Sequence, residues 1–261
     1  MNGALSHDRK IGPHFTIASV WSGTWSAYAA HPFFFLSMCA LATIPRLVEI
    51  YMALRLLPLK AIMTGVGDLA HYFFCLGVIA CATVNTLDGR RHTVSDALGE
   101  YRGSLVTLLC FVVFHRLFDF ALPVFFEGRS TVELVHYLVM VFFLTLILYV
   151  FFGVYFGVAV QAVAVEGLGF VASLMRSRGL VRGHWWKLFV LYIMRFAVLS
   201  VVIPIISLAI TGRDSPYHLL VRYLISFAPE SYFCVMWAVV YRNLRIEREG
   251  VPPEKIASVF T

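Results

Sequence analysis

Ionisable side chains inside long apolar runs are the residues of this chain that could do chemistry. Two runs carry the same pattern, Arg-Leu-x-acid, from Arg46 to Glu49 and from Arg116 to Asp119. This spacing places each cation one helical turn from its own carboxylate. A lone charge at mid-bilayer costs about 2.5–3.5 kcal/mol even on the milder insertion scale, so these groups need compensation. We therefore predict an intramembrane polar network whose candidate members are Arg46, Glu49, Asp68, His71, His115, Arg116, Asp119, Glu166, Arg195 and Glu230.

Three uses of this network follow from its residue types. The charged groups could pair and fix the register of the helices, and those near the end of a run could reach the membrane surface. Acids, arginines and histidines in such positions also form pathways for protons, ions or anionic substrates in transporters. His71, His115, Asp68 and Asp119 are possible metal ligands, but their spacing matches no metal-binding motif, so we predict neither a metal nor a cofactor.

A second group of candidates lies between two apolar runs, in residues 163–192. After Gly167 and Gly169, the pattern predicts a surface helix with one apolar face (Phe170, Val171, Leu174 and Met175) and one polar face (Ser173, Arg176 and Ser177). Cations and indoles then crowd together, a mixture that suits the headgroup layer. The candidate site for a lipid headgroup or another anion comprises Arg176, Arg178, Arg182, His184, Trp185 and Lys187. An ordinary basic interfacial loop is the alternative.

The same stretch resembles a signature of bacterial multi-span proteins. The resemblance is carried by Glu166-Gly167, by Ala172-Ser173-Leu174, by the run from Arg176 to Trp185 and by the tail from Tyr241 to Val251. The group is named after the glycerophosphoryl diester phosphodiesterase membrane domain and is related to the YciC-like inner-membrane proteins. The resemblance covers most of the chain and implies six spans in a bacterial inner membrane, without a settled activity. The phosphodiesterase domain that some relatives append has no counterpart in this sequence, and neither has its set of His, Glu and Asp.

Composition identifies the elements that must position these residues. Hydrophobic residues make up 60% of the 261 and charged residues 14%, whereas a soluble domain is nearer half apolar and a quarter charged. Six apolar runs are long enough to cross a hydrocarbon core, at 32–57, 62–87, 105–126, 133–165, 188–210 and 217–241. Gly153 and Gly157 in the fourth run favour close helix packing. We predict an all-α polytopic membrane protein with six transmembrane helices and three interfacial amphipathic helices.

Three similar segments indicate an internal repeat. FTIASVW begins at Phe15, HTVSDAL at His92 and GFVASLM at Gly169, at intervals of 77 residues, and each segment precedes two apolar runs. The pattern predicts three units that each comprise an amphipathic helix and a helical hairpin.

The distribution of basic residues predicts the topology. Most Lys and Arg residues lie before the first run and in the segments 88–103, 167–187 and 242–261, so the positive-inside rule places both termini in the cytoplasm. We predict a single integral membrane domain over 1–261. It comprises a cytoplasmic N-terminus with an interfacial helix (1–31), a six-span bundle (32–241) and a cytoplasmic tail (242–261). The predicted location is a bacterial inner membrane.

The sequence contains no G-x-S-x-G elbow, H-E-x-x-H, P-loop or G-x-G-x-x-G motif, so we predict no enzyme. The five cysteines lie in apolar runs without metal-type spacing, and we interpret them as buried packing residues. The net charge of +6 is interleaved with apolar runs, which favours anionic lipid over nucleic acid as a partner. We expect a non-enzymatic membrane component that engages anionic lipid or a protein partner at its basic cytoplasmic face; a homo-oligomer is a further candidate assembly. The alternative is a transporter or channel for a small solute, ion or lipid that uses the polar network.

Overall fold

The computed structural model describes residues 15–53, 66–89, 107–110, 112–113, 151, 153–212 and 218–250, and in these ranges every regular element is a helix. Three helices are long and apolar enough to cross a membrane, namely Val66–Leu87, Trp185–Thr211 and Leu220–Glu249. Two bent pairs raise the number to as many as five, Ile17–Ala30 with Pro32–Pro45 and Gly153–Glu166 with Phe170–Val181. The described residues are thus all-helical, as predicted, and include several helices that could cross a membrane. Six spans and the threefold repeat stay predictions, because the segment from His92 and most of the third and fourth runs lie outside the described residues.

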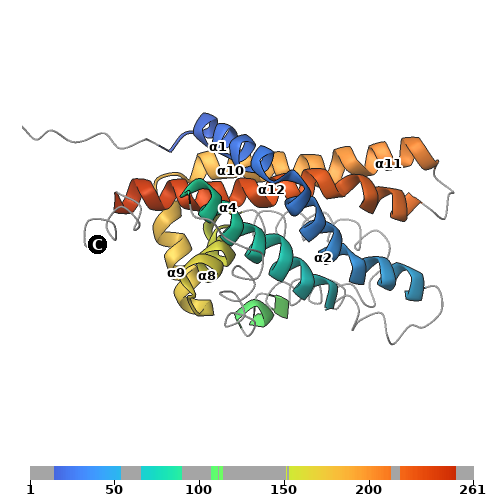
Figure 1. Ribbon diagram of the computed structural model, residues 1–261, viewed down its shortest axis with the longest axis horizontal. Coiled ribbons are helices and arrows are strands. Elements are labelled where there is room, and N and C mark those ends of the chain that lie inside the picture. Colours follow the sequence, from blue (N-terminus) through green and yellow to red (C-terminus); the bar gives the residue numbers. More distant parts are fainter. Residues whose placement is uncertain are drawn as a thin grey trace, which may run out of the picture.

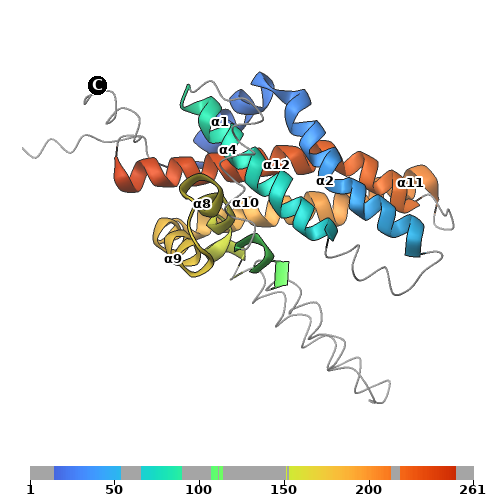
Figure 2. The same ribbon diagram turned by 60° about the horizontal axis from the view of Figure 1, so that its bottom comes forward.

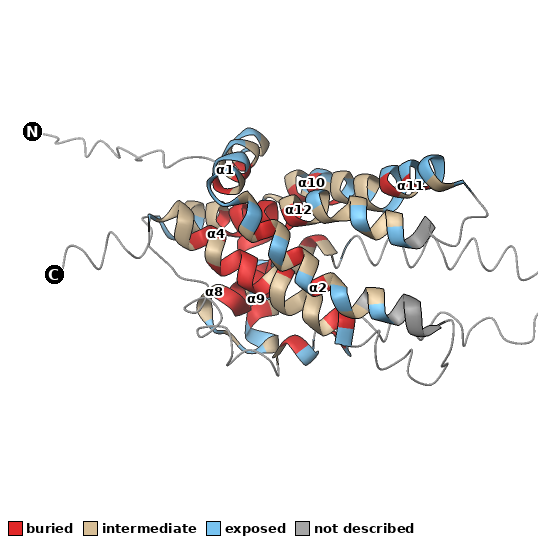
Figure 3. Cartoon of the chain, turned by 45° about the vertical axis from the view of Figure 1, so that its right-hand side comes forward, coloured by how far each residue is buried: buried red, intermediate tan, exposed pale blue. Residues whose placement is uncertain are grey.

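Helix α12 (His218–Glu249) is the element on which the others pack. It runs the length of the molecule and contacts α1 (Ile17–Ala30), α2 (Pro32–Ala53), α4 (Ile79–Leu87) and α11 (Ile203–Thr211) (Figure 1). From Phe233 to Tyr241 every residue of α12 is buried, as expected for a helix that is apolar on all sides. Figure 3 shows that the buried residues gather where α12 meets α4 and α8 (Ala159–Glu166).

The first predicted interfacial helix forms as α1. Thr16 and Ser19 build a capping box at its start, with the Thr16 hydroxyl accepting from the Ser19 backbone N–H at 3.0 Å. Small residues of α1 face α12, while Trp21 stacks on Tyr232 at a ring separation of 5.6 Å. The chain then bends by 89° into α2.

Two of the long helices contain π-helical turns. Val66–Leu87 includes η1 (His71–Val78) before α4, and Trp185–Thr211 includes η3 (Val198–Val202) between α10 (Trp185–Ala197) and α11. Pro204 lies two residues after the end of η3, and proline cannot donate the backbone bond that a regular helix requires there. The wider turn thus absorbs the local mismatch, a role that π-bulges often have.

The predicted break at the glycines is confirmed. Helix α8 ends at Glu166 because Gly167 adopts a left-handed conformation, with φ of 65°, which suits glycine. Helix α9 (Phe170–Val181) then leaves at an angle of 119°, and α8 and α9 lie against one end of α12 (Figure 2).

The predicted faces of α9 are observed in part. Ser173 and Ser177 are buried against the protein, whereas Val171 and Met175 point away from it. The predicted apolar face is therefore divided, because Phe170 and Leu174 are half-buried and pack against the core. Val171 and Met175 lie outward, as suits a helix at a lipid boundary.

Close packing at the predicted glycine pair is also observed. A Cβ atom at Gly153 would lie 2.6 Å from the ring of Tyr192, so only glycine permits this approach of α10. A Cβ at Gly157 would lie 3.4 Å from the indole of Trp237 on α12.

Helix α12 continues to Glu249, beyond Tyr241, where we predicted that the last span ends. Part of the predicted tail is therefore helical. Arg242 pairs with Asp88 at the end of α4, and this contact holds the extension against the bundle.

Candidate functional site

A polar cavity lies within the candidate spans, between α2, η1, α10 and α12. Its volume is about 270 Å³, and its polar lining includes Thr43, Asp68, His71, Arg195 and Glu230. Asp68 and His71 come from the beginning of the long helix Val66–Leu87, and Arg195 and Glu230 come from within Trp185–Thr211 and Leu220–Glu249. The Arg195 guanidinium donates to Glu230 Oε1 at 2.9 Å, and His71 Nε2 lies 3.7 Å from the same oxygen.

A second cavity of about 340 Å³ adjoins the first, because Arg195, Tyr223, Ser226 and Glu230 line both. It adds Arg222 to the polar lining. The ion pair between Arg195 and Glu230 therefore forms part of the wall of both spaces. Together they offer cations, carboxylates, hydroxyls and an imidazole, which suits a small solute with charges of both signs, or a proton relay.

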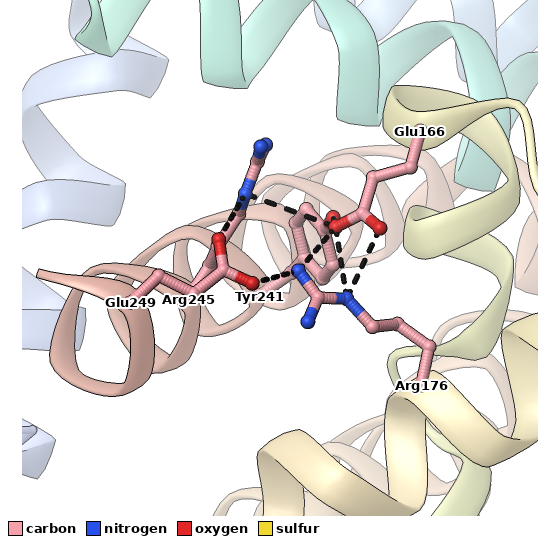
Figure 4. A network of polar contacts seen from close by, with 5 residues as sticks. All are labelled: Glu166, Arg176, Tyr241, Arg245 and Glu249. Carbon is pink, nitrogen blue, oxygen red and sulfur yellow. Dashed lines mark hydrogen bonds and ion pairs between the residues drawn. The ribbon is translucent and has the colours of Figure 1, made fainter. Parts of the chain in front are cut away.

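Glu166 belongs to a different cluster, at the end of the bundle where α8, α9 and α12 meet (Figure 4). Arg176 Nη2 donates to Glu166 Oε1 at 2.8 Å, and its Nε donates to Glu166 Oε2 at 3.0 Å. The Tyr241 hydroxyl donates to the same carboxylate. Arg176 also pairs with Glu249, which accepts from Arg245 at 3.1 Å. This alternating set of charges fastens α9 to α8 and α12.

The predicted lipid or anion site is divided by these contacts. Arg176 is held between two carboxylates, and Lys187 Nζ donates to the Phe15 carbonyl at 2.6 Å. Trp185 stacks on Phe189 at a ring separation of 5.2 Å. Arg178 and Arg182 are exposed, so these two cations are the predicted members of the site that the fold leaves on the surface.

His184 lies where the linker between α9 and α10 meets the start of α1. Its Nε2 is 3.3 Å from Glu247 Oε2, and its ring packs edge-on against Phe15. Glu247 also accepts from the Phe15 backbone N–H at 3.1 Å. Burial lowers the pKa of His184, and the nearby Lys187 and Arg248 act in the same direction while Glu247 opposes them. The neutral imidazole is therefore favoured, with its ring against Phe15 and its Nε2 facing Glu247.

The structure brings together four of the ten predicted network residues, namely Asp68, His71, Arg195 and Glu230. Glu166 lies in the other cluster. Arg46 and Glu49 lie on α2, with side chains that are not among those described. His115, Arg116 and Asp119 fall outside the described residues, so their part in the network stays a prediction.

Sequence reasoning missed several partners. Tyr241 and Glu249 belong to the Glu166 cluster, and Glu247 contacts His184 and Phe15, whereas the sequence places all three in the last span or the tail without a role. The spacing of four residues between Arg245 and Glu249 was a usable signal for a pair on one helix face. Asp88 and Arg242 gave no such signal, because 154 residues separate them.

Comparison with family models found one match, which covers residues 15–240 and is described as a domain of unknown function, DUF7847. Comparison with curated proteins and comparison with solved structures found no match. The resemblance to the phosphodiesterase membrane-domain group stays a prediction, because the matching family carries no link to it.

Proposed function

We propose that this chain, which belongs to the family defined by the DUF7847 domain, binds a small polar or charged solute, or an ion, and moves it across the membrane. The description of the family names no activity, so the proposal is drawn from the geometry of the site. The observation that supports this proposal is the pair of adjoining cavities lined by Asp68, His71, Arg195 and Glu230. Charged groups inside a bundle mark solute and ion pathways in many transporters. A merely structural ion pair would not need two cavities at its sides.

The first step of the test is a solute screen by thermal unfolding. The purified full chain, in detergent, is incubated with a panel of ions, amino acids and small organic acids. A solute that binds only the folded protein stabilises it by about 2.7 kcal/mol at 100 times its Kd. We expect the shift to disappear in Glu230→Gln and in the double variant Arg195→Gln/Glu230→Gln, which removes both charges of the pair. Arg178→Gln, far from the cavities on α9, should keep the shift.

The second step measures flux of each stabilising solute, and of protons with a pH-sensitive dye, in proteoliposomes. We expect flux in the wild type and a loss in Glu230→Gln. Stabilisation that is equal in the wild type and in the double variant, or flux that is indifferent to both substitutions, would contradict the proposal. The double variant keeps the test decisive if Glu230→Gln alone unfolds the chain.

A second candidate function is attachment to anionic lipid through the outer face of α9 and the start of α10. Val171, Met175 and Trp186 are 68%, 63% and 71% exposed, and Arg178 and Arg182 lie beside them. Apolar side chains flanked by cations suit the headgroup boundary of an anionic membrane. In contrast to our expectation from the sequence, Arg176 and Lys187 contribute little to this surface, because they are engaged within the protein.

This candidate is tested by native mass spectrometry of the protein released from nanodiscs that contain phosphatidylglycerol. Each cation near an anionic surface contributes about 1 kcal/mol, so Arg178→Gln/Arg182→Gln should weaken lipid retention by roughly 30-fold. The matched control is Lys187→Gln, whose cation is engaged with the Phe15 carbonyl and should affect retention little. Equal lipid retention in the wild type, in the double variant and in Lys187→Gln would contradict lipid binding by this face. A protein partner would then be sought by crosslinking.

A further inference from the structure

Three of the five cysteines meet at one point inside the bundle, although they are far apart in the sequence. Cys39 comes from α2, Cys75 from η1 and Cys234 from α12. Their Sγ atoms all lie within 4.8 Å of one another, and those of Cys39 and Cys75 are 3.3 Å apart. All three residues are buried, with exposed fractions of 1%, 1% and 2%.

One buried cysteine is adequately explained as a small apolar residue. Cys81 is such a case, because its thiol donates to the Ala164 carbonyl at 3.1 Å, away from the other thiols. A meeting of three thiols from three separate helices is different. It surrounds a common centre with three soft ligand atoms, and the helices that carry them are held in place by the core.

The thiols adjoin the polar cavity. Cys39 is itself part of the cavity lining, together with His71 and Glu230. Cys75 and His71 lie on the same π-helix, an element that is frequent at functional sites. An ion that reaches the cavity therefore meets the Cys39 residue, and the imidazole and carboxylate in the same lining can exchange the protons that binding displaces.

We propose that Cys39, Cys75 and Cys234 bind one soft, thiophilic ion through their three sulfur atoms. Thiolate ligands select soft ions such as monovalent copper. Structural zinc sites use four protein ligands, which makes zinc a poorer match for three thiols. This site adjoins the first solute cavity, whose lining includes Cys39, but the inference does not depend on solute transport.

The apolar surroundings favour an ion whose complex is neutral. The thiols lie in a cluster with Ala27, Phe35, Ala42, Ile79, Val235 and Val239. Arsenous acid reacts with three thiols so that each S–H proton leaves with one hydroxide as water. Three arsenic–sulfur bonds replace three arsenic–oxygen bonds, no electrons are transferred, and the product carries no charge.

Monovalent copper held by three thiolates instead leaves two negative charges and releases three protons. A buried net charge is costly without a partner. Trivalent arsenic is therefore the better match in charge, and copper is the second ion of the same chemistry.

The experiment uses the full chain in detergent, reduced with a phosphine that is removed without air before the titration, because a dithiol or a phosphine left in solution would compete for the ion. The reference protein is Cys81→Ala/Cys110→Ser, which keeps only the three clustered cysteines. It is titrated in separate arms with arsenite and with monovalent copper, and bound ion is counted by mass spectrometry of the elements. X-ray absorption then counts the sulfur neighbours of the bound ion. This measurement is made on the wild type as well as on the reference protein, so it does not depend on any substitution.

We expect one ion per chain with three sulfur neighbours, in the arsenite arm, the copper arm or both. Each of three substitutions made in the reference protein, Cys39→Ser, Cys75→Ser and Cys234→Ser, should weaken binding of the ion by at least about 10- to 100-fold. Losses in that range are known for residues that only hydrogen-bond to the ligands of a metal. The arm that gives the tighter complex identifies the ion.

The proposal is overturned if neither ion binds the reference protein, if the bound ion has two sulfur neighbours, or if any one of the three substitutions leaves binding unchanged. Thermal unfolding of each variant without ion separates loss of the site from loss of the fold. Should a variant fail to fold, the sulfur count on the wild type decides.

Discussion

The ion pair between Glu166 and Arg176 joins α8 to α9, and its contribution to the stability of the protein can be measured directly. We propose a double-mutant cycle with Glu166→Gln and Arg176→Gln, which keep the size of the side chains and remove the charges. Hydrogen bonds to charged groups contribute about 1.5–3 kcal/mol, and removing one partner of a fully buried pair costs about 3–5 kcal/mol. Because the two side chains are 17% and 28% exposed, water weakens the interaction toward the lower end of these ranges.

We therefore expect each single substitution to lower the free energy of unfolding by about 2–3 kcal/mol. For a chain of this length, that loss corresponds to a decrease in Tm of roughly 5–10 °C. The double variant should be destabilised by less than the sum of the two, with a coupling of about 1–2 kcal/mol. Thermal unfolding of the purified chain in one detergent measures all four corners of the cycle.

The matched control is Arg178→Gln, because Arg178 lies on the same helix and is exposed. An exposed substitution of this kind should change stability by no more than about 0.5 kcal/mol. Additive effects of Glu166→Gln and Arg176→Gln would refute the structural role of the pair. A loss of bound anionic lipid in Arg176→Gln at unchanged stability would return Arg176 to the lipid site that the sequence predicts.

Three further substitutions test individual contacts by thermal unfolding. Because burial lowers the pKa of His184, the unfolded chain binds the proton more readily. The stability that depends on the neutral ring should thus be complete above about pH 6.5 and decrease as the pH falls below it, and a slope equally steep in His184→Gln would contradict this. Gly153→Ala should lower the free energy of unfolding by about 1–3 kcal/mol, because the added methyl group meets the Tyr192 ring. The control Gly179→Ala, which has open space around it, should be neutral or stabilising. Equal effects of the two substitutions would show that the close approach at Gly153 is unimportant. Thr16→Ala should cost about 1 kcal/mol through loss of the cap of α1, and an unchanged Tm would place the start of α1 under the control of Phe15 instead.

The sequence predicted the helices and several of their limits because those depend on local properties. Pro32 begins α2, Gly167 ends α8, and the apolar runs have the length of a span. The four residues of the cavity were predicted as members of one network, because a charge in an apolar run needs a partner wherever that partner lies. Their grouping around Glu230 depends on how the helices pack, and the spacing of residues in the sequence does not predict that.

The faces of α9 show a second limit of sequence patterns. Periodicity separates Val171 and Met175 from Ser173 and Ser177, but it does not say which side is lipid and which is protein. In water Val171 and Met175 would be expected to pack inward, whereas here the two serines do, and Ser177 donates to the Tyr155 carbonyl at 2.9 Å. The three clustered cysteines could not be predicted by spacing rules, because each of them comes from a different helix.

The central position of α12 bears on how the protein is made. The carboxylates Asp88 and Glu166 leave the ribosome well before the α12 residues that bind them, Arg242 and Tyr241. At about 5–20 residues per second, the 154 residues between Asp88 and Arg242 correspond to a wait of roughly 8–30 s. During that time the earlier helices are in the membrane with their main packing partner still missing, and their carboxylates must find water or headgroups instead. A pause in translation before α12 would prolong that exposed state, and so the speed of synthesis becomes part of what decides whether this bundle closes.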